Sequence, residues 1–343
     1  MKREIIYQIF VRNFSKEGTF KKVEEDLPRL KDFGVTIVYL MPIHEIGVKN
    51  RKGTIGSPYS IKDYFSISKD LGNEKDLISL INKTHELGMK IIVDMVFNHT
   101  SRDNPLMVTH PEYYYHPNND ITKFGNKVGD WSDVCDLETS REDTQEYLLS
   151  VLKYWANIGF DGFRFDVASI ISFDFFKKAR KLLGNELIFF AESIDYDFVK
   201  YAREIGFTVT NDKDLYPTFN MLYNYNWYRP FERYLKGQEP TMEKTLNAIK
   251  EDNLPEGFYR ANALENHDTE RIASYLKDEE AIKKITDFVF NLKGHIFIYA
   301  GEEYLEDHRP DLFEKDPINW KKYETKKSQQ YYQYLKKKIS NVN

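Results

Sequence analysis

Residues 159–166 of the sequence read GFDGFRFD, and they follow a long segment with helical periodicity. The opening glycine is a helix-stop signal, so the apolar residues behind it begin a short strand. Side chains alternate along a strand, which places Arg164 and Asp166 on one side and Phe163 and Phe165 on the other. We therefore expect a strand that brings two ionisable groups to its carboxyl end.

Strand and helix signals alternate on both sides of this stretch. Short apolar runs are separated by longer amphipathic segments, several of which end at a glycine. We expect strands over residues 5–12, 35–41, 90–97, 160–166, 186–191, 207–210, 258–265 and 295–299. We expect helices over residues 20–33, 74–87, 143–157, 173–183, 195–204, 279–292 and 321–338, with further helix inside 218–251.

Eight successive strand–helix units predict an α/β fold, a (β/α)8 TIM barrel, because crossover helices connect parallel neighbours. The alternative is a doubly wound open sheet, which usually has fewer strands and a phosphate loop; no such loop pattern is present. About forty residues separate the third strand from its helix, and a connection of that length is usually functional. We predict a barrel over residues 1–99 and 143–343, with a short insertion domain (domain B) over 100–142.

The composition excludes several classes of protein. A net charge of −5 over 343 residues argues against a general nucleic-acid binder and suits a neutral substrate. The single cysteine, Cys135, excludes an internal disulfide and a cysteine-based zinc site. No run of 18 apolar residues occurs, and the apolar stretch near the start is too short and strand-like for a signal peptide. We expect no membrane partner and a cytoplasmic location, with the oligomeric state left open.

Polar residues lie at the ends of four predicted strands, where a barrel enzyme carries its chemistry. One such residue alone could be a helix cap or part of a turn. Four strands that deliver polar groups at one level are different, because buried carboxylates are costly unless they are paired or functional. The residues are Asp94, Asn98 and His99 on strand three, Arg164 and Asp166 on strand four, Glu192 on strand five, and Glu265 to Asp268 on strand seven.

Three carboxylates near an arginine and two histidines suggest glycoside hydrolysis. Arg164 should lower the pKa of Asp166 and keep that carboxyl ionised, as a nucleophile requires. The apolar residues before Glu192 should desolvate its carboxyl and raise its pKa, as a general acid requires. The residues alone do not distinguish retention from inversion at the sugar.

Four segments in order resemble the motifs of glycoside hydrolase family 13, the α-amylase family. The first segment is Asp94-Met-Val-Phe-Asn98-His99 and the second is Gly162-Phe-Arg164-Phe-Asp166. The third is Glu192 at the end of strand five, and the fourth is Asn266-His267-Asp268. The resemblance extends from Tyr7 to Trp320. It implies a retaining double displacement on gluco-oligosaccharides or α-glucans, and hence a glycosidase of the α-amylase or α-glucosidase type.

The resemblance also implies a role for each motif residue. Asp166 would be the nucleophile, Glu192 the acid and then the base, and Asp268 would hold sugar hydroxyls and stabilise the transition state. The implied substrate-binding residues are Arg164, which orients Asp166; His99 and His267, which bind sugar hydroxyls; Asp94 of the first motif; and Tyr59, which stacks on the sugar unless it is a packed loop residue. Asp136 resembles a residue near the end of the insertion and either shapes the site or forms a turn.

The sequence also departs from the family pattern. Val167-Ala168-Ser169-Ile170 follows the expected nucleophile where α-amylases commonly carry a Lys-His pair, which argues against an endo-acting α-amylase. Ser57-Pro58 replaces the usual His-Gly before Tyr59. The short insertion suggests an open cleft or few subsites. The C-terminal β-sandwich of the family is expected to be either absent or removed from this chain.

Calcium is the one metal that the resemblance suggests. Many family members bind it through the asparagine of the first motif, which is Asn98 here. Further oxygen donors in the insertion are Asp103, Asp120, Asp130 and Asp133. Their spacing is irregular, so we expect solvated loop acids and no required cofactor, with a calcium site at Asn98 as the alternative.

Three functions remain open from the sequence. The first is hydrolysis of α-linked gluco-oligosaccharides. The second is transglycosylation, in which a sugar replaces water at the same intermediate; loop shape decides between the two. The third is a catalytically silent carbohydrate-binding or scaffold protein, which the presence of all three carboxylates argues against.

Overall fold

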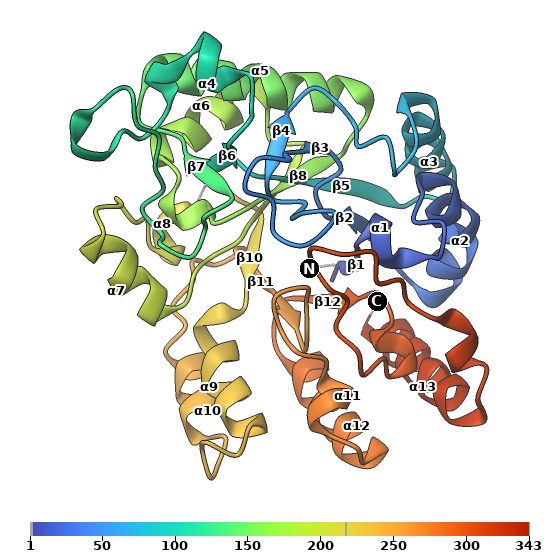
Figure 1. Ribbon diagram of the computed structural model, residues 1–343. Helices are drawn as coiled ribbons and strands as arrows, with labels where there is room; N and C mark the ends of the chain where they lie inside the picture. The colour runs from blue at the N-terminus through green and yellow to red at the C-terminus, as the bar shows by residue number, and fades with distance from the viewer. Residues whose placement is uncertain (1–2, 217, 343) are drawn as a thin grey trace.

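The computed structural model describes residues 3–216 and 218–342. Within this part, eight parallel strands close into a barrel in the order β1-β2-β5-β8-β9-β10-β11-β12, and β12 pairs with β1 (Figure 1). The strands are β1 (Ile5–Ile9), β2 (Ile37–Leu40), β5 (Lys90–Met95), β8 (Gly162–Phe165), β9 (Ile188–Ala191), β10 (Met221–Tyr223), β11 (Tyr259–Ala263) and β12 (His295–Tyr299). The predicted (β/α)8 barrel is confirmed.

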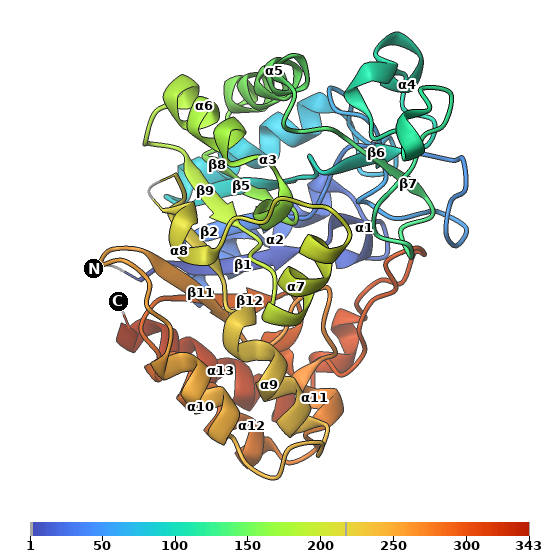
Figure 2. The ribbon, with the colours of Figure 1, turned by 90° about the vertical axis from the view of Figure 1, so that its left-hand side faces the viewer.

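Helices alternate with these strands and cover the outside of the barrel (Figure 2). The longer helices are α2 (Phe20–Phe33), α3 (Glu74–Glu86), α5 (Glu142–Ile158), α6 (Phe173–Leu183), α7 (Tyr196–Glu204), α9 (Tyr225–Leu235), α10 (Glu243–Lys250), α12 (Glu279–Asn291) and α13 (Lys326–Val342). Shorter ones are α1 (Val11–Phe14), α4 (Leu106–Thr109), α8 (Asp212–Leu215) and α11 (Ile272–Tyr275). None of the described helices is long and apolar enough to cross a lipid bilayer.

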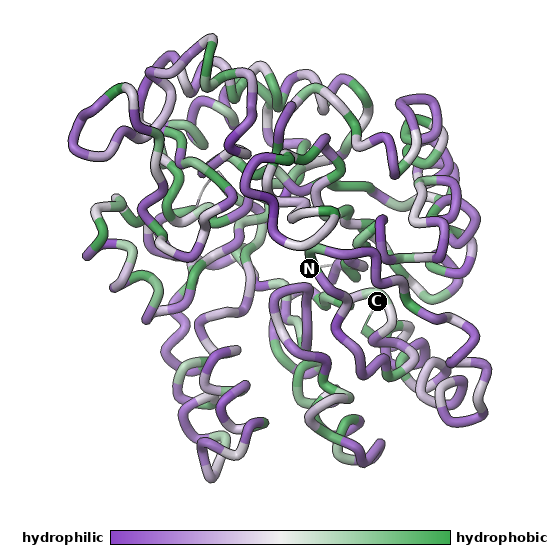
Figure 3. Tube along the Cα trace, viewed as in Figure 1, coloured by the Kyte–Doolittle hydropathy of each residue, from purple (hydrophilic) through white to green (hydrophobic). Residues whose placement is uncertain are grey.

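The alternation along β8 places aromatic rings outside the barrel and charged groups inside it. Phe165 packs edge-on against Phe176 of α6, with ring centroids 5.1 Å apart, and against Phe189 of β9 at 5.0 Å. Arg164 points the other way and contacts Asp94 of β5. Apolar segments accordingly follow the barrel strands, and hydrophilic segments dominate the periphery (Figure 3). The core thus fixes the direction in which the ionisable residues point.

The sixth strand lies elsewhere than the sequence predicted. Residues 207–210 form no strand, and β10 takes this place from within the segment expected to contain helix. Phe207 instead packs in a small cluster outside the barrel with Val167 and Ile170. Met221 pairs with Phe190 of β9, and this strand has only three residues, too few to show an alternating pattern.

Two connections at the carboxyl ends of the strands carry small antiparallel sheets. After β5, β6 (His99–Ser101) pairs with β7 (Val134–Asp136), and residues 100–142 lie over the barrel mouth. After β2, β3 (Glu45–Ile46) pairs with β4 (Ile61–Asp63), a feature that the sequence did not indicate. The division into a barrel and an insertion domain at residues 100–142 stays a prediction.

Candidate active site

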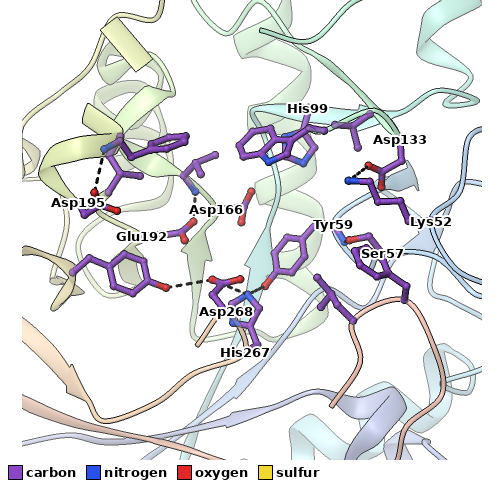
Figure 4. Close-up of a pocket in the computed structure, with 18 of the residues that line it drawn as sticks. Lys52, Ser57, Tyr59, His99, Asp133, Asp166, Glu192, Asp195, His267 and Asp268 are labelled. Carbon is purple, nitrogen blue, oxygen red and sulfur yellow. Dashed lines mark hydrogen bonds and ion pairs between the residues drawn. The ribbon is translucent and has the colours of Figure 1, made fainter. Parts of the chain in front are cut away.

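A cavity of about 430 Å³ opens where the barrel strands end. Asp166 follows β8, Glu192 follows β9 and Asp268 lies beyond β11, and all three carboxylates line this cavity (Figure 4). The structure therefore brings together three side chains that are far apart in the sequence. His99, His267 and Tyr59 line the same cavity, whereas Arg164 and Asp94 are fully buried.

One arginine contacts three of the carboxylates. Arg164 Nη1 lies 2.8 Å from Asp166 Oδ1 and 2.8 Å from Asp94 Oδ1, and its Nη2 lies 3.0 Å from Glu192 Oε2. The arrangement follows from strand pairing, because Asp94 of β5 and Arg164 of β8 are register partners. A guanidinium with no exposed surface needs such partners to offset its lost hydration. The site thus carries excess negative charge around one cation.

The charge balance changes the expected state of Asp166. Burial raises the pKa of Asp166 well above its ordinary value, and the nearby charge of Glu192 raises it further. Arg164 lowers this pKa, as expected from the sequence, but it does not outweigh the other two effects. Burial likewise raises the pKa of Glu192, as predicted from its apolar neighbours. Adjacent carboxyls in such surroundings favour sharing one proton, the state in which one is an acid and the other an anion.

A strained residue connects these two carboxyls. Val167 follows Asp166 directly, and its backbone N–H donates a 2.6 Å hydrogen bond to Glu192 Oε2. Val167 has φ 40° and ψ 43°, a left-handed conformation that is rare for a β-branched residue. Strain of this kind costs roughly 1–3 kcal/mol and is typical of functional sites. The turn after β8 therefore fixes where the Glu192 carboxyl points.

Tyr225 orients Asp268 and was missed in the sequence analysis. Its hydroxyl donates to Asp268 Oδ2 at 3.2 Å and accepts from Asn266 Nδ2 at 2.8 Å. It opens α9, two residues after the end of β10. A strand assigned to Met221–Tyr223 would have placed Tyr225 at the barrel mouth. The signal in the sequence that could have indicated this strand was the short apolar run before Tyr225.

Tyr59 and His267 form one wall of the cavity. Their rings stack with centroids 5.3 Å apart, and Tyr59 Oη lies 2.6 Å from His267 Nε2 and 3.0 Å from Asp94 Oδ2. Gln8 Nε2 donates to His267 Nδ1 at 2.9 Å, a contact that the sequence did not indicate. Burial lowers the pKa of His267 to about 3, so its ring is neutral and carries its proton on Nε2, toward Tyr59. Tyr59 thereby presents a fixed aromatic surface, while its stacking on a sugar stays a prediction.

His99 begins β6 at the base of the insertion, and its ring lies within hydrogen-bonding reach of the backbone of Tyr59. Its ring centroid is 5.1 Å from that of Trp131, and burial lowers the pKa of His99 to about 4. Its neighbour Asn98 is directed toward Asp136, with Nδ2 3.4 Å from Oδ1. Burial raises the pKa of Asp136 to about 6, although the backbone N–H of Lys127 donates to its other oxygen at 2.7 Å. Asp136 therefore shapes the join between insertion and barrel.

The expected oxygen donors do not assemble into a calcium site. Asp103 accepts from the backbone of Val48, Asp120 pairs with Lys123, and the side chain of Asp133 pairs with Lys52, as does the backbone carbonyl of Asp130. Among the described residues, no group of three or more histidines, cysteines, aspartates or glutamates could hold a metal ion. Calcium needs six to eight oxygen ligands. The donor set around Asn98 does not fit that requirement, and calcium independence stays a prediction.

Comparison with known proteins shows which sequences this chain is similar to. The family model "Alpha amylase, catalytic domain" matches residues 8–341. Alpha-amylase 3 of Dictyoglomus thermophilum is 26% identical over 93% of this chain and 68% of its own length. Intracellular maltogenic amylase of Bacillus subtilis is 25% identical over 94% of this chain, which spans 54% of that relative.

Solved structures named as alpha-amylases are also similar to this chain. An alpha-amylase from Lactobacillus plantarum is 37% identical, with a TM-score of 0.91 over 99% of this chain and 79% of that one. A noncanonic maltogenic alpha-amylase from Thermotoga neapolitana is 32% identical, with a TM-score of 0.87 over all of this chain and 77% of that one.

Proposed function

The chain belongs to the α-amylase catalytic-domain family, and we propose that it hydrolyses α-linked gluco-oligosaccharides with retention at the anomeric carbon. The observation that carries the proposal is the convergence of Asp166, Glu192 and Asp268 on one cavity at the barrel mouth. The names of the relatives support an α-glucan as the substrate class.

The geometry supports a distinct role for each carboxylate. In the first step, Asp166 attacks the anomeric carbon while Glu192 gives its proton to the glycosidic oxygen, which leaves with the departing sugar. In the second step, Glu192 takes a proton from water, the resulting hydroxide attacks the same carbon, and Asp166 is released. Asp268, held by Tyr225, would bind hydroxyls of the reacting sugar.

Transglycosylation is the second candidate, and one observation favours it. The cavity wall on the side of Glu192 includes the apolar side chains of Val167, Ile194 and Phe198. An apolar wall disfavours free water and offers a surface to the face of an acceptor sugar. Both reactions use the same intermediate, so the acceptor decides between them.

Other features of the proposal follow from the chemistry. The reaction needs two carboxyls and water, so we expect no cofactor. The single, buried thiol of Cys135 agrees with a cytoplasmic location, which stays part of the proposal.

Product analysis tests the proposed function. The protein is incubated separately with maltose, maltotriose to maltoheptaose, isomaltose, sucrose, trehalose and starch, and the products are separated by chromatography. Shorter products alone support hydrolysis, and longer products support transfer. A folded protein that changes none of these sugars would contradict both enzymatic functions and favour a silent carbohydrate-binding role.

A further inference from the structure

The two sides of the cavity are built differently. Glu192 and Asp195 lie on one side of Asp166, and Tyr59 and Lys52 lie on the other (Figure 4). The proposed acid gives its proton to the leaving oxygen, so the leaving sugar, and with it the reducing end of the chain, lies on the Glu192 side. The rest of the donor, which runs to the non-reducing end, lies on the Tyr59 side.

Three segments of the chain meet on that donor side at one ammonium group. Lys52 Nζ donates to the carbonyl of Asp130 at 2.8 Å and lies 3.2 Å from Asp133 Oδ1. It also lies 5.9 Å from the ring centroid of Phe313. Lys52 belongs to the connection after β2, Asp133 to the insertion, and Phe313 to the segment after β12. We call Lys52, Asp133 and Phe313 the donor-side clasp.

The segment that carries Lys52 is held in place along its length. The backbone N–H groups of Ile55 and Gly56 both donate to the carbonyl of Phe313 at 3.1 Å. Arg12 bridges the same two segments, because its Nη1 donates to the carbonyls of Gly56 at 2.9 Å and Leu312 at 3.3 Å. Breaking these contacts would leave buried donors of Arg12 without partners, which is costly, so they hold the two segments together. The segments that carry Lys52 and Phe313 are therefore held together by the backbone as well as by the side chains of the clasp.

A second attachment fastens this connection to the insertion. Gly47 approaches the insertion so closely that a Cβ there would lie 2.3 Å from the Ser101 side chain. Beside it, the backbone N–H of Val48 donates to Asp103 Oδ2 at 3.0 Å. The connection after β2 thus contacts the insertion at several points, because Ser60 Oγ also donates to the carbonyl of Asp133 at 3.2 Å and Asn104 Nδ2 donates to the carbonyl of Ile61 at 3.4 Å.

We propose that the donor-side clasp closes the cavity, so that an α-glucan chain enters only by its non-reducing end and yields one short product. This inference rests on the proposed function and specifies its mode of action. A cleft that cuts within a chain must be open on both sides of the carboxylates. The volume of about 430 Å³ agrees with a pocket, since it lies in the lower part of the usual range of ~300–1,000 Å³ for small-molecule sites.

The test uses two forms of maltoheptaose. One is unmodified, and the other is capped on its terminal non-reducing glucose by an ethylidene group across O4 and O6. The wild-type protein should turn over the capped form about a hundredfold more slowly, because a closed pocket rejects added bulk. The unmodified form should give a single short sugar as its early product.

Variants of the clasp residues test whether the clasp causes the slower turnover of the capped form. Lys52→Ala should raise the ratio of capped to unmodified turnover by about tenfold, and Phe313→Ala should change the ratio in the same direction. Lys49→Ala, which removes an exposed lysine of the same connection, should leave the ratio as in the wild type. Melting temperatures of all three variants report whether the fold is kept.

Each remaining outcome has a separate meaning. Equal turnover of both heptaoses by the wild type would overturn the clasp proposal and leave the proposed hydrolysis standing. A folded Lys52→Ala variant and a folded Phe313→Ala variant that both keep the wild-type ratio would also overturn it. Turnover of neither heptaose would overturn the inference, while the proposed function would still be decided by the wider set of sugars in the product analysis.

Discussion

The backbone N–H of Val167 donates a 2.6 Å hydrogen bond to Oε2 of Glu192. Val167 is the residue after Asp166, so one peptide group connects the proposed nucleophile to the proposed acid. Arg164 supplies the positive charge beside this pair, because its guanidinium contacts both carboxyls. The relative position of the two carboxyls is therefore set by backbone geometry and by a single guanidinium.

Replacing Asp166 by asparagine should remove turnover without harming the fold. We expect a loss of about a thousandfold or more, since the neutral amide is a much poorer nucleophile than the carboxylate. The melting temperature should stay the same or rise, because three carboxylates share one guanidinium and the change removes one negative charge. Glu192→Gln should behave likewise, and Asp174→Asn, an exposed change on α6, should alter neither quantity. A purified Asp166→Asn protein with wild-type rates would contradict the nucleophile assignment.

Tyr225→Phe tests the support of Asp268. The variant loses one hydrogen bond to a carboxylate, worth roughly 1.5–3 kcal/mol, which corresponds to a drop in kcat of about ten- to a hundredfold. KM should change much less if Asp268 acts mainly in the transition state. Steady-state kinetics on maltotriose measure both, with Tyr201→Phe on α7 as the matched exposed control. A raised KM with unchanged kcat would instead make Tyr225 a simple binding residue.

Asp166 was predicted from the sequence as a site residue, whereas Tyr225 was not. Strands with a clear apolar run, such as β5 (Lys90–Met95) and β12 (His295–Tyr299), were predictable, and so were the ionisable residues at the ends of β5, β8 and β9. The three-residue β10 was not, because its strand conformation comes from pairing with β9 and β11. Misplacing it hid Tyr225. The net direction of the pKa shift at Asp166 was equally out of reach, since it depends on distances among four groups from three strands.

His44 should make the protein less stable in acid. Both ring nitrogens are buried without a hydrogen-bond partner among the described residues, and the ring packs edge-on against Trp155 at 5.2 Å. Burial lowers the pKa of His44 to about 3, so the folded state binds its proton less readily than the unfolded state. Stability is therefore present above the ordinary pKa and is lost as the pH falls from about 6.5 toward 3.

His44→Phe measures that loss. The stability advantage of the variant over the wild type should grow by about 1.4 kcal/mol per pH unit below pH 6.5, as urea unfolding at several pH values would show. Parallel pH profiles for His44→Phe and the wild type would mean that the buried ring does not titrate as described.

Chelation should leave the fold unchanged. Asp120 and Asp133 of the insertion pair with lysines, Asp103 accepts from a backbone amide, and Asn98 faces a single carboxylate, Asp136. Thermal melts in EDTA and in millimolar calcium should therefore coincide. A melting temperature that drops by several degrees in EDTA and recovers with calcium would contradict this expectation.

The closure of the barrel between β1 and β12 has a consequence for how the protein is made. Ile5 lies opposite Ile296, so β1 waits for β12, the last strand of the barrel to be synthesised. At ordinary translation rates this interval is on the order of tens of seconds, during which one edge of β1 has no partner. Gln8 on that strand also contacts His267, which is synthesised late. The catalytic cavity is therefore completed only once β11 and β12 have been synthesised, and until then the open edge of β1 can associate with other strands.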